Sequence, residues 1–144
     1  MSPKRPDAIE YTGWHTTRMD TLAWLRVGVD TRADQAIVAM VGEVDIACTT
    51  ALGLMLFALV EQGFVRIVVD LSGVEFCDAH GCGLMARVSR QAVQHGGWLR
   101  VAGARPHVAR VIRIVRLTRA LPAYRTVSDA LEGSAGAAHD SGCD

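Results

Sequence analysis

The stretch CDAHGCG, Cys77 to Gly83, places two thiols, a carboxylate and an imidazole within seven residues. It follows an apolar run ending in Asp70-Leu71-Ser72 and precedes a run whose apolar residues have helical spacing. Such side chains could support thiol catalysis or metal binding, because a cysteine beside a base can become a nucleophile and thiolates bind zinc. Cys82 would lie in the first turn of the helix, where the positive end of the helix dipole lowers the pKa of a thiol.

The rest of the sequence supports neither thiol catalysis nor metal binding. No further residue is recognisable as the group that would orient a Cys82–His80 pair, and neighbours in sequence are rarely arranged as catalytic partners. Four soft ligands are available in total: Cys48, Cys77, His80 and Cys82. However, Cys-x-x-His-x-Cys is not a usual zinc spacing. We therefore predict no catalytic residue, no metal and no cofactor, with the cysteines packed as small hydrophobic side chains.

Phosphate and nucleic-acid binding also lack a motif. The chain contains no G-x-x-x-x-G-K-[ST] loop. Residues 79–128 hold nine arginines and no acidic residue, but only Trp98 and Tyr124 are aromatic there, and no reader motif is present. We predict no direct binding of nucleic acid. The arginines are interpreted as solvated side chains, with a docking face for an acidic partner as the alternative.

Composition indicates one globular domain. The chain has 144 residues, half of them hydrophobic, and a formal net charge of zero. The longest apolar run, Ala51 to Val60, is about half of what a bilayer requires, so no membrane association is expected. The first residues lack the apolar core of a signal peptide. We therefore expect a cytoplasmic protein whose four cysteines are mostly reduced.

The order of the expected elements favours an α/β fold. Two β-like runs, 22–27 and 36–41, are separated by a turn and predict an antiparallel hairpin at the start of a sheet. Apolar spacing then predicts a helix over 51–61, capped by Thr49-Thr50, and a central strand over 66–71, buried on both faces. Further elements are a helix over 81–95, a strand over 98–102, a helix after Pro106, and a short strand and helix around Thr126. Alternation of this kind implies a mainly parallel sheet covered by helices.

A family resemblance extends these predictions. The segment from Val65 to Leu131, beginning VRIVVDLSGVEFCDAHGCGLMARV, resembles the STAS domain of bacterial anti-sigma factor antagonists, and GEVDIACTTAL at Gly42 to Leu52 is similar to the family's second-strand motif. The resemblance implies a single STAS-like domain over residues 21–132, between an N-terminal tail (1–20) and a flexible C-terminal tail (133–144). Its sheet would be mostly parallel and mixed, with four to five strands, the N-terminal hairpin and about four helices.

The resemblance also assigns roles to residues. In that family the strand-to-helix loop reads D-S-S-G or D-S-x-G, and the second position after the aspartate is phosphorylated by a kinase that is itself the anti-sigma factor. Here the loop is Asp78-Ala79-His80-Gly81, so His80 occupies the phosphoacceptor position and the loop has no hydroxyl. The resemblance implies a partner-binding loop at one end of the sheet: Asp45, Asp78, Ala79, His80, Gly81 and Cys82. Helix capping or turn formation would equally account for the two aspartates.

The implied function is that of a non-enzymatic binding module that regulates transcription, with a role in stress responses. Its partner would be an anti-sigma factor with a histidine-kinase-like ATPase fold. Two alternatives stay open: a redox or ligand sensor that uses Cys48, Cys77 and Cys82, and a non-phosphorylated subunit of a stress-signalling assembly. A homodimer is compatible with each of them.

Overall fold

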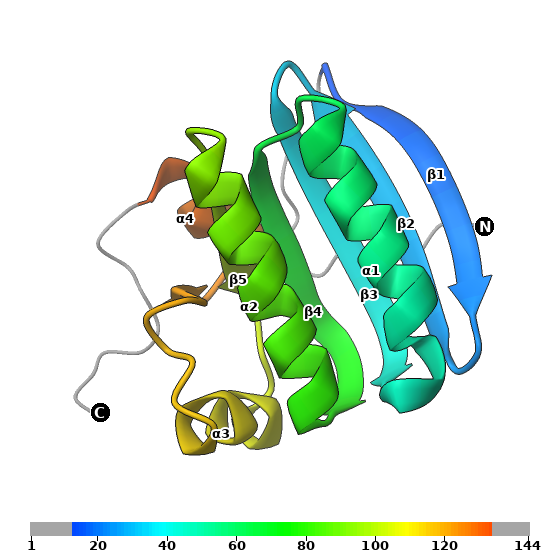
Figure 1. Cartoon of the computed structure of the whole chain (residues 1–144), viewed down its shortest axis with the longest axis vertical. Coiled ribbons are helices and arrows are strands. Elements are labelled where there is room, and N and C mark those ends of the chain that lie inside the picture. Colours follow the sequence, from blue (N-terminus) through cyan, green and yellow to red (C-terminus); the bar gives the residue numbers. More distant parts are fainter. Residues whose placement is uncertain (1–12, 134–144) are drawn as a thin grey trace.

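A computed structural model describes residues 13–133 and contains one mixed sheet flanked by helices (Figure 1). The described elements are β1 (His15–Leu22), β2 (Leu25–Arg32), β3 (Gln35–Val44), α1 (Ile46–Glu61), β4 (Arg66–Cys77), α2 (Ala79–Gln94), β5 (Trp98–Ala102), α3 (Pro106–Ile114), β6 (Ala123–Tyr124) and α4 (Val127–Glu132). The strands lie in the sheet in chain order. The first three are antiparallel, and β3 to β6 are parallel. The predicted α/β fold class is confirmed.

Within residues 13–133 the sheet has six strands, where the sequence predicts four to five. The additional strand is β1, and most of it falls in residues 1–20, which are predicted as a tail. Its sequence, HTTRMDTL, is mostly polar and lacks the alternation of apolar and polar side chains that would predict a strand. This composition agrees with the exposure of most of its residues. Residues 1–12 and 134–144, which include most of both predicted tails and Cys143, lie outside the described residues.

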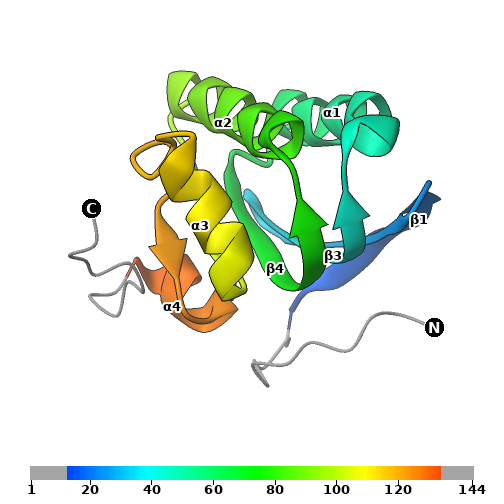
Figure 2. The same ribbon diagram turned by 90° about the horizontal axis from the view of Figure 1, so that it is seen from below.

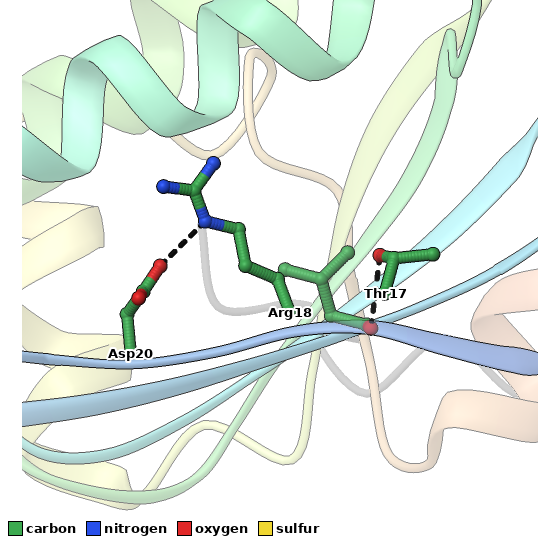
Figure 3. A network of polar contacts seen from close by, with 4 residues as sticks. Thr17, Arg18 and Asp20 are labelled. Atoms are coloured by element: carbon green, nitrogen blue, oxygen red, sulfur yellow. Dashed lines mark hydrogen bonds and ion pairs between the residues drawn. The ribbon is translucent and has the colours of Figure 1, made fainter.

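Strand β1 is irregular and polar. Its register against β2 shifts between Thr16 and Arg18, which leaves Thr17 as the extra residue of a bulge. The Thr17 Oγ1 hydroxyl donates to the Val29 carbonyl oxygen at 3.3 Å. Figure 3 shows the side chains of Thr17, Arg18 and Asp20, with Arg18 paired to Asp20 along the strand. The Arg18–Asp20 pair lies at the surface and therefore contributes little to stability.

The main core lies between the sheet and helices α1 and α2. Figure 2 shows these two helices side by side over β3 and β4. Alternate residues of the inner strands point into this layer, among them Val38, Met40, Ile67, Val69 and Leu71. On the opposite face, Ile37 and Val68 pack with Val127 and Ala130 of α4. Strand β4 is therefore buried on both faces, as its continuous apolar sequence predicts.

Helix starts differ from the sequence prediction at both junctions of the site, and α2 begins at Ala79, two residues before the predicted start. Helix α1 begins at Ile46 and not near Ala51, because Asp45 accepts a hydrogen bond from the Ala47 amide at 2.9 Å and so acts as the N-cap. The predicted Thr49-Thr50 cap is wrong, since both threonines lie inside the helix. Thr126 caps α4, because its side-chain oxygen accepts a 3.0 Å hydrogen bond from the Asp129 amide.

Candidate functional site

Two loops meet at the carboxyl ends of β3 and β4. Val44 and Cys77 are opposite each other in the parallel register, and the Asp78 amide donates to the Val44 carbonyl oxygen at 3.1 Å. Asp45 and Asp78 are therefore the next residues on neighbouring strands. The structure thus brings the two predicted site aspartates to the same end of the sheet, each immediately before a helix on the same face.

Both aspartates are N-caps. Asp45 Oδ1 accepts from the Ala47 amide, and Asp78 Oδ1 accepts from the Gly81 amide, each at 2.9 Å. Capping satisfies amides that would otherwise lack a partner in the first turn, and a negative charge there interacts favourably with the helix dipole. The side chains thus have a structural role, and they also hold negative charge at the rim of the site.

Ala79 and His80 form the exposed tip of the second loop. Both residues are exposed in the first turn of α2, whereas Gly81 is buried behind them. A Cβ atom at Gly81 would come within 2.6 Å of Val44 Cγ1 and 2.9 Å of Cys77 Sγ. The absence of a side chain at this position therefore lets α2 start directly against the ends of β3 and β4, with His80 facing solvent.

An exposed apolar face of α1 borders this tip and was not anticipated from the sequence. Ile46 and Leu54 have exposed fractions of 65% and 72%, and Ala47 and Ala51 between them are also exposed. The sequence of α1 carries a signal for this face, because residues 46–60 contain no charged residue and Thr49 and Thr50 are the only hydroxyl side chains among them. Exposed apolar patches beside polar rims are typical of interaction sites.

We call this region the docking surface. It consists of Asp45, Ile46, Ala47, Ala51, Leu54, Asp78, Ala79 and His80. The loop residues bring carboxylates and an imidazole, and the helix residues bring apolar area. Gly81 and Cys82, which the resemblance includes in the partner-binding loop, are buried and support this surface from below.

Three cysteines lie beneath the docking surface. Cys48, Cys77 and Cys82 are all buried and free. Cys77 Sγ and Cys82 Sγ are 3.7 Å apart, and Cys48 Sγ donates to the Asp45 carbonyl oxygen at 3.4 Å. The thiol–thiol hydrogen bond raises the pKa of Cys77, which burial raises further, and lowers the pKa of Cys82. Burial raises the pKa of the Cys48 thiol. The cysteines thus pack as small core side chains, and two of them also pair.

The residues of the candidate site do not form a recognisable metal centre. Within residues 13–133, no three or more His, Cys, Asp or Glu side chains are grouped so as to hold a metal ion. Over the same range, every helix is too short or too polar to cross a membrane. The arrangement that the structure does present is an exposed surface of mixed polarity, which suits binding of another macromolecule.

Comparisons with known proteins agree with the geometry. The family model described as "Mlab, STAS domain" matches residues 27–123. A candidate anti-sigma factor antagonist of Thermotoga neapolitana is 31% identical over 71 residues, which are 49% of this chain and 63% of that relative. A solved anti-sigma factor antagonist from Mycobacterium paratuberculosis is 28% identical, with a TM-score of 0.68 over 76% of this chain and 92% of that one.

More distant structures share the fold alone. The unphosphorylated anti-sigma factor antagonist SpoIIAA of Bacillus is 16% identical, with a TM-score of 0.65 over 75% of this chain and 97% of that one. The chain spans less than two thirds of the length of the curated relatives that it matches. Sequence and structure comparisons therefore point to one and the same domain type.

Proposed function

The chain belongs to the STAS domain family, and from this premise we propose that it is a non-enzymatic cytoplasmic binding module that regulates transcription as an anti-sigma factor antagonist. Its partner would be an anti-sigma factor with a histidine-kinase-like ATPase fold. The observation that carries the proposal is the docking surface at the carboxyl ends of β3 and β4, where Asp45 and Asp78 flank the exposed first turn of α2.

The composition of the docking surface supports binding of a protein. The apolar face of α1 offers area that a partner can remove from water, at about 25 cal/mol per Å² of apolar surface. Asp45 and Asp78 add carboxylates at the rim, which favour a partner with basic side chains at the matching positions. The apolar residues would contribute most of the affinity, and the aspartates would fix orientation.

His80 makes this binding independent of serine phosphorylation in the loop. The two serines nearest to it in sequence are both hydrogen-bonded. Ser72 donates its hydroxyl to Asp70 Oδ1 at 2.7 Å, and Ser89 is buried and donates to the Ala120 carbonyl oxygen at 2.7 Å. A kinase acting at the usual position would find an imidazole, and the repulsion that a phosphate introduces at such a surface would not arise.

Site-specific crosslinking tests the proposal. A photo-crosslinking amino acid replaces His80 in one variant and Val93 in a control variant, because both positions are exposed on α2 but lie near opposite ends of that helix. We expect position 80 to capture a protein with an ATPase domain of histidine-kinase-like fold, and position 93 not to capture it. The captured protein is then purified and its affinity for the unmodified chain is measured by calorimetry.

Two results would contradict the proposal. Equal capture from positions 80 and 93 would show that the docking surface is not the contact. Capture of other STAS proteins alone would favour the alternative of a subunit in a larger signalling assembly.

A further inference from the structure

Cys77 and Cys82 form a close thiol pair directly behind the docking surface. Their Sγ atoms are 3.7 Å apart, and the exposed fractions of the two residues are 1% and 0%. Cys77 ends β4 and Cys82 lies in the first turns of α2, so the exposed residues Ala79 and His80 are part of the segment that links them. Any bond between the two sulfurs would therefore close a small ring that contains the tip of the docking surface.

The two thiols are chemically different. Cys77 shares its hydrogen bond with Cys82, and this contact lowers the pKa of Cys82 while it raises that of Cys77. Cys82 also lies near the N-terminus of the 16-residue helix α2, where the helix dipole favours a negative charge. Cys82 is therefore the better nucleophile, and Cys77 is positioned to react with whatever forms on its sulfur.

Access requires only a local opening. The first turn of α2 is held at its start by the bond from the Gly81 amide to Asp78, and helix ends open more readily than helix centres. A small, uncharged oxidant such as hydrogen peroxide could then reach Cys82 without unfolding of the sheet. Cys48 is not a member of this thiol pair, because its own thiol donates a hydrogen bond to the Asp45 carbonyl oxygen.

We propose that Cys77 and Cys82 are a peroxide-oxidised dithiol whose disulfide changes the shape of the docking surface and weakens partner binding. In the first step the Cys82 thiolate attacks one oxygen of hydrogen peroxide, the O–O bond breaks, and sulfenic acid and hydroxide form. In the second step the Cys77 sulfur attacks the Cys82 sulfur, and the S–O bond breaks with loss of water. Overall, two thiols are oxidised to a disulfide and one peroxide is reduced to two waters.

Formation of the disulfide must move the loop. A disulfide has an S–S length of about 2.05 Å, so the two sulfurs must approach by about 1.6 Å. Cys77 Sγ already packs so closely against Gly81 that a Cβ atom there would be 2.9 Å away. Displacement of either sulfur therefore disturbs the Asp78–Gly81 turn that presents His80. The effect on binding rests on the proposed function, whereas the formation of the disulfide does not.

Peptide mapping tests the disulfide directly. Cleavage after arginine releases residues 67–87, which contain both Cys77 and Cys82, separately from residues 33–66 with Cys48 and residues 126–144 with Cys143. The full chain is treated with hydrogen peroxide, free thiols are alkylated, and the peptides are analysed by mass spectrometry. We expect peptide 67–87 to lose two hydrogen atoms and resist alkylation, and dithiothreitol to reverse both changes. The Cys82→Ser variant should show neither change.

Several results would overturn the assignment. Peptide 67–87 that stays fully alkylated while Cys143 is oxidised would exclude the dithiol. A disulfide from Cys77 or Cys82 to Cys48 or Cys143 would show that the proposed pair is wrong. Irreversible oxidation of Cys82 with Cys77 still free would exclude Cys77 as the resolving thiol.

Binding is measured separately with the partner captured from position 80. We expect the disulfide form to bind at least tenfold more weakly than the reduced form, and Cys82→Ser, which lacks the thiol that peroxide attacks, to bind equally before and after peroxide treatment. Equal affinity of the two forms would overturn the effect on the docking surface. Failure to capture a partner would contradict the proposed function and leave the mapped disulfide standing, so the two failures are distinguishable.

Discussion

Replacement of Gly81 with alanine tests how tightly α2 is seated on the strand ends. The new Cβ atom would lie 2.6 Å from Val44 Cγ1 and 2.9 Å from Cys77 Sγ, so the neighbours must move. Such overpacking costs about 1–3 kcal/mol. Removal of a glycine from a helix returns about 0.5–1 kcal/mol, so we expect Gly81→Ala to be less stable than the unmodified chain by up to about 2 kcal/mol.

Gly83→Ala is the matched control. Gly83 lies two residues further along the same helix, and the nearest atom to its added Cβ is Arg87 Nη1 at 3.8 Å, an ordinary contact. This variant should gain about 0.5–1 kcal/mol. Urea unfolding followed by circular dichroism measures both variants, provided that their m values agree. The reasoning would be refuted if Gly81→Ala were as stable as Gly83→Ala. It would also be refuted if Gly81→Ala lost the same free energy of unfolding in a Val44→Ala background, where the closer contact is removed.

Four further outcomes are expected. Asp78→Ala should lose about 1 kcal/mol of stability in urea unfolding because the α2 cap is lost, whereas Asp78→Asn should keep the cap and weaken partner binding only. His80→Ser should become phosphorylated when incubated with the partner kinase and ATP, while the unmodified chain, analysed by mass spectrometry, should carry no phosphate in the loop. Val108→Asp should destabilise the fold by several kcal/mol because it buries a carboxylate, and the exposed Arg113→Ala should be nearly silent by the same unfolding assay. Burial raises the pKa of Cys48, so the unfolded chain ionises this thiol first, and stability should fall as the pH rises above about 8.5, with a smaller fall in Cys48→Ser.

The sequence predicts most of the fold because its buried elements have clear patterns. The strand over 98–102 has the predicted bounds, and the helix predicted after Pro106 is α3, with Val108 and Ile112 buried. Strand β1 escapes prediction because an exposed edge strand needs no apolar alternation, and only its pairing with β2 identifies it. Pairing with β2, and not the local sequence, therefore determines that residues 15–22 form a strand.

The candidate site is predictable only in part. Adjacent parallel strands bring Asp45 and Asp78 to one end of the sheet, which the resemblance implies. The apolar face of α1 is not predictable by spacing, because a helix that is apolar all round does not reveal which side stays in water. The separation of Cys77 and Cys82 along the chain permits a contact between the sulfurs, but their distance depends on how α2 packs against β3 and β4 through Gly81.

The outer strands of the sheet influence how the molecule behaves in a crowded solution. An unpaired strand edge is a template on which another chain can add its own strand, and long, flat, apolar edges promote aggregation. Here one edge is β1, which is charged and interrupted by the Thr17 bulge, and the other is β6, which has only two residues. Both edges are therefore poor templates for an incoming strand. The exposed apolar face of α1 is therefore not accompanied by a sheet edge that favours aggregation.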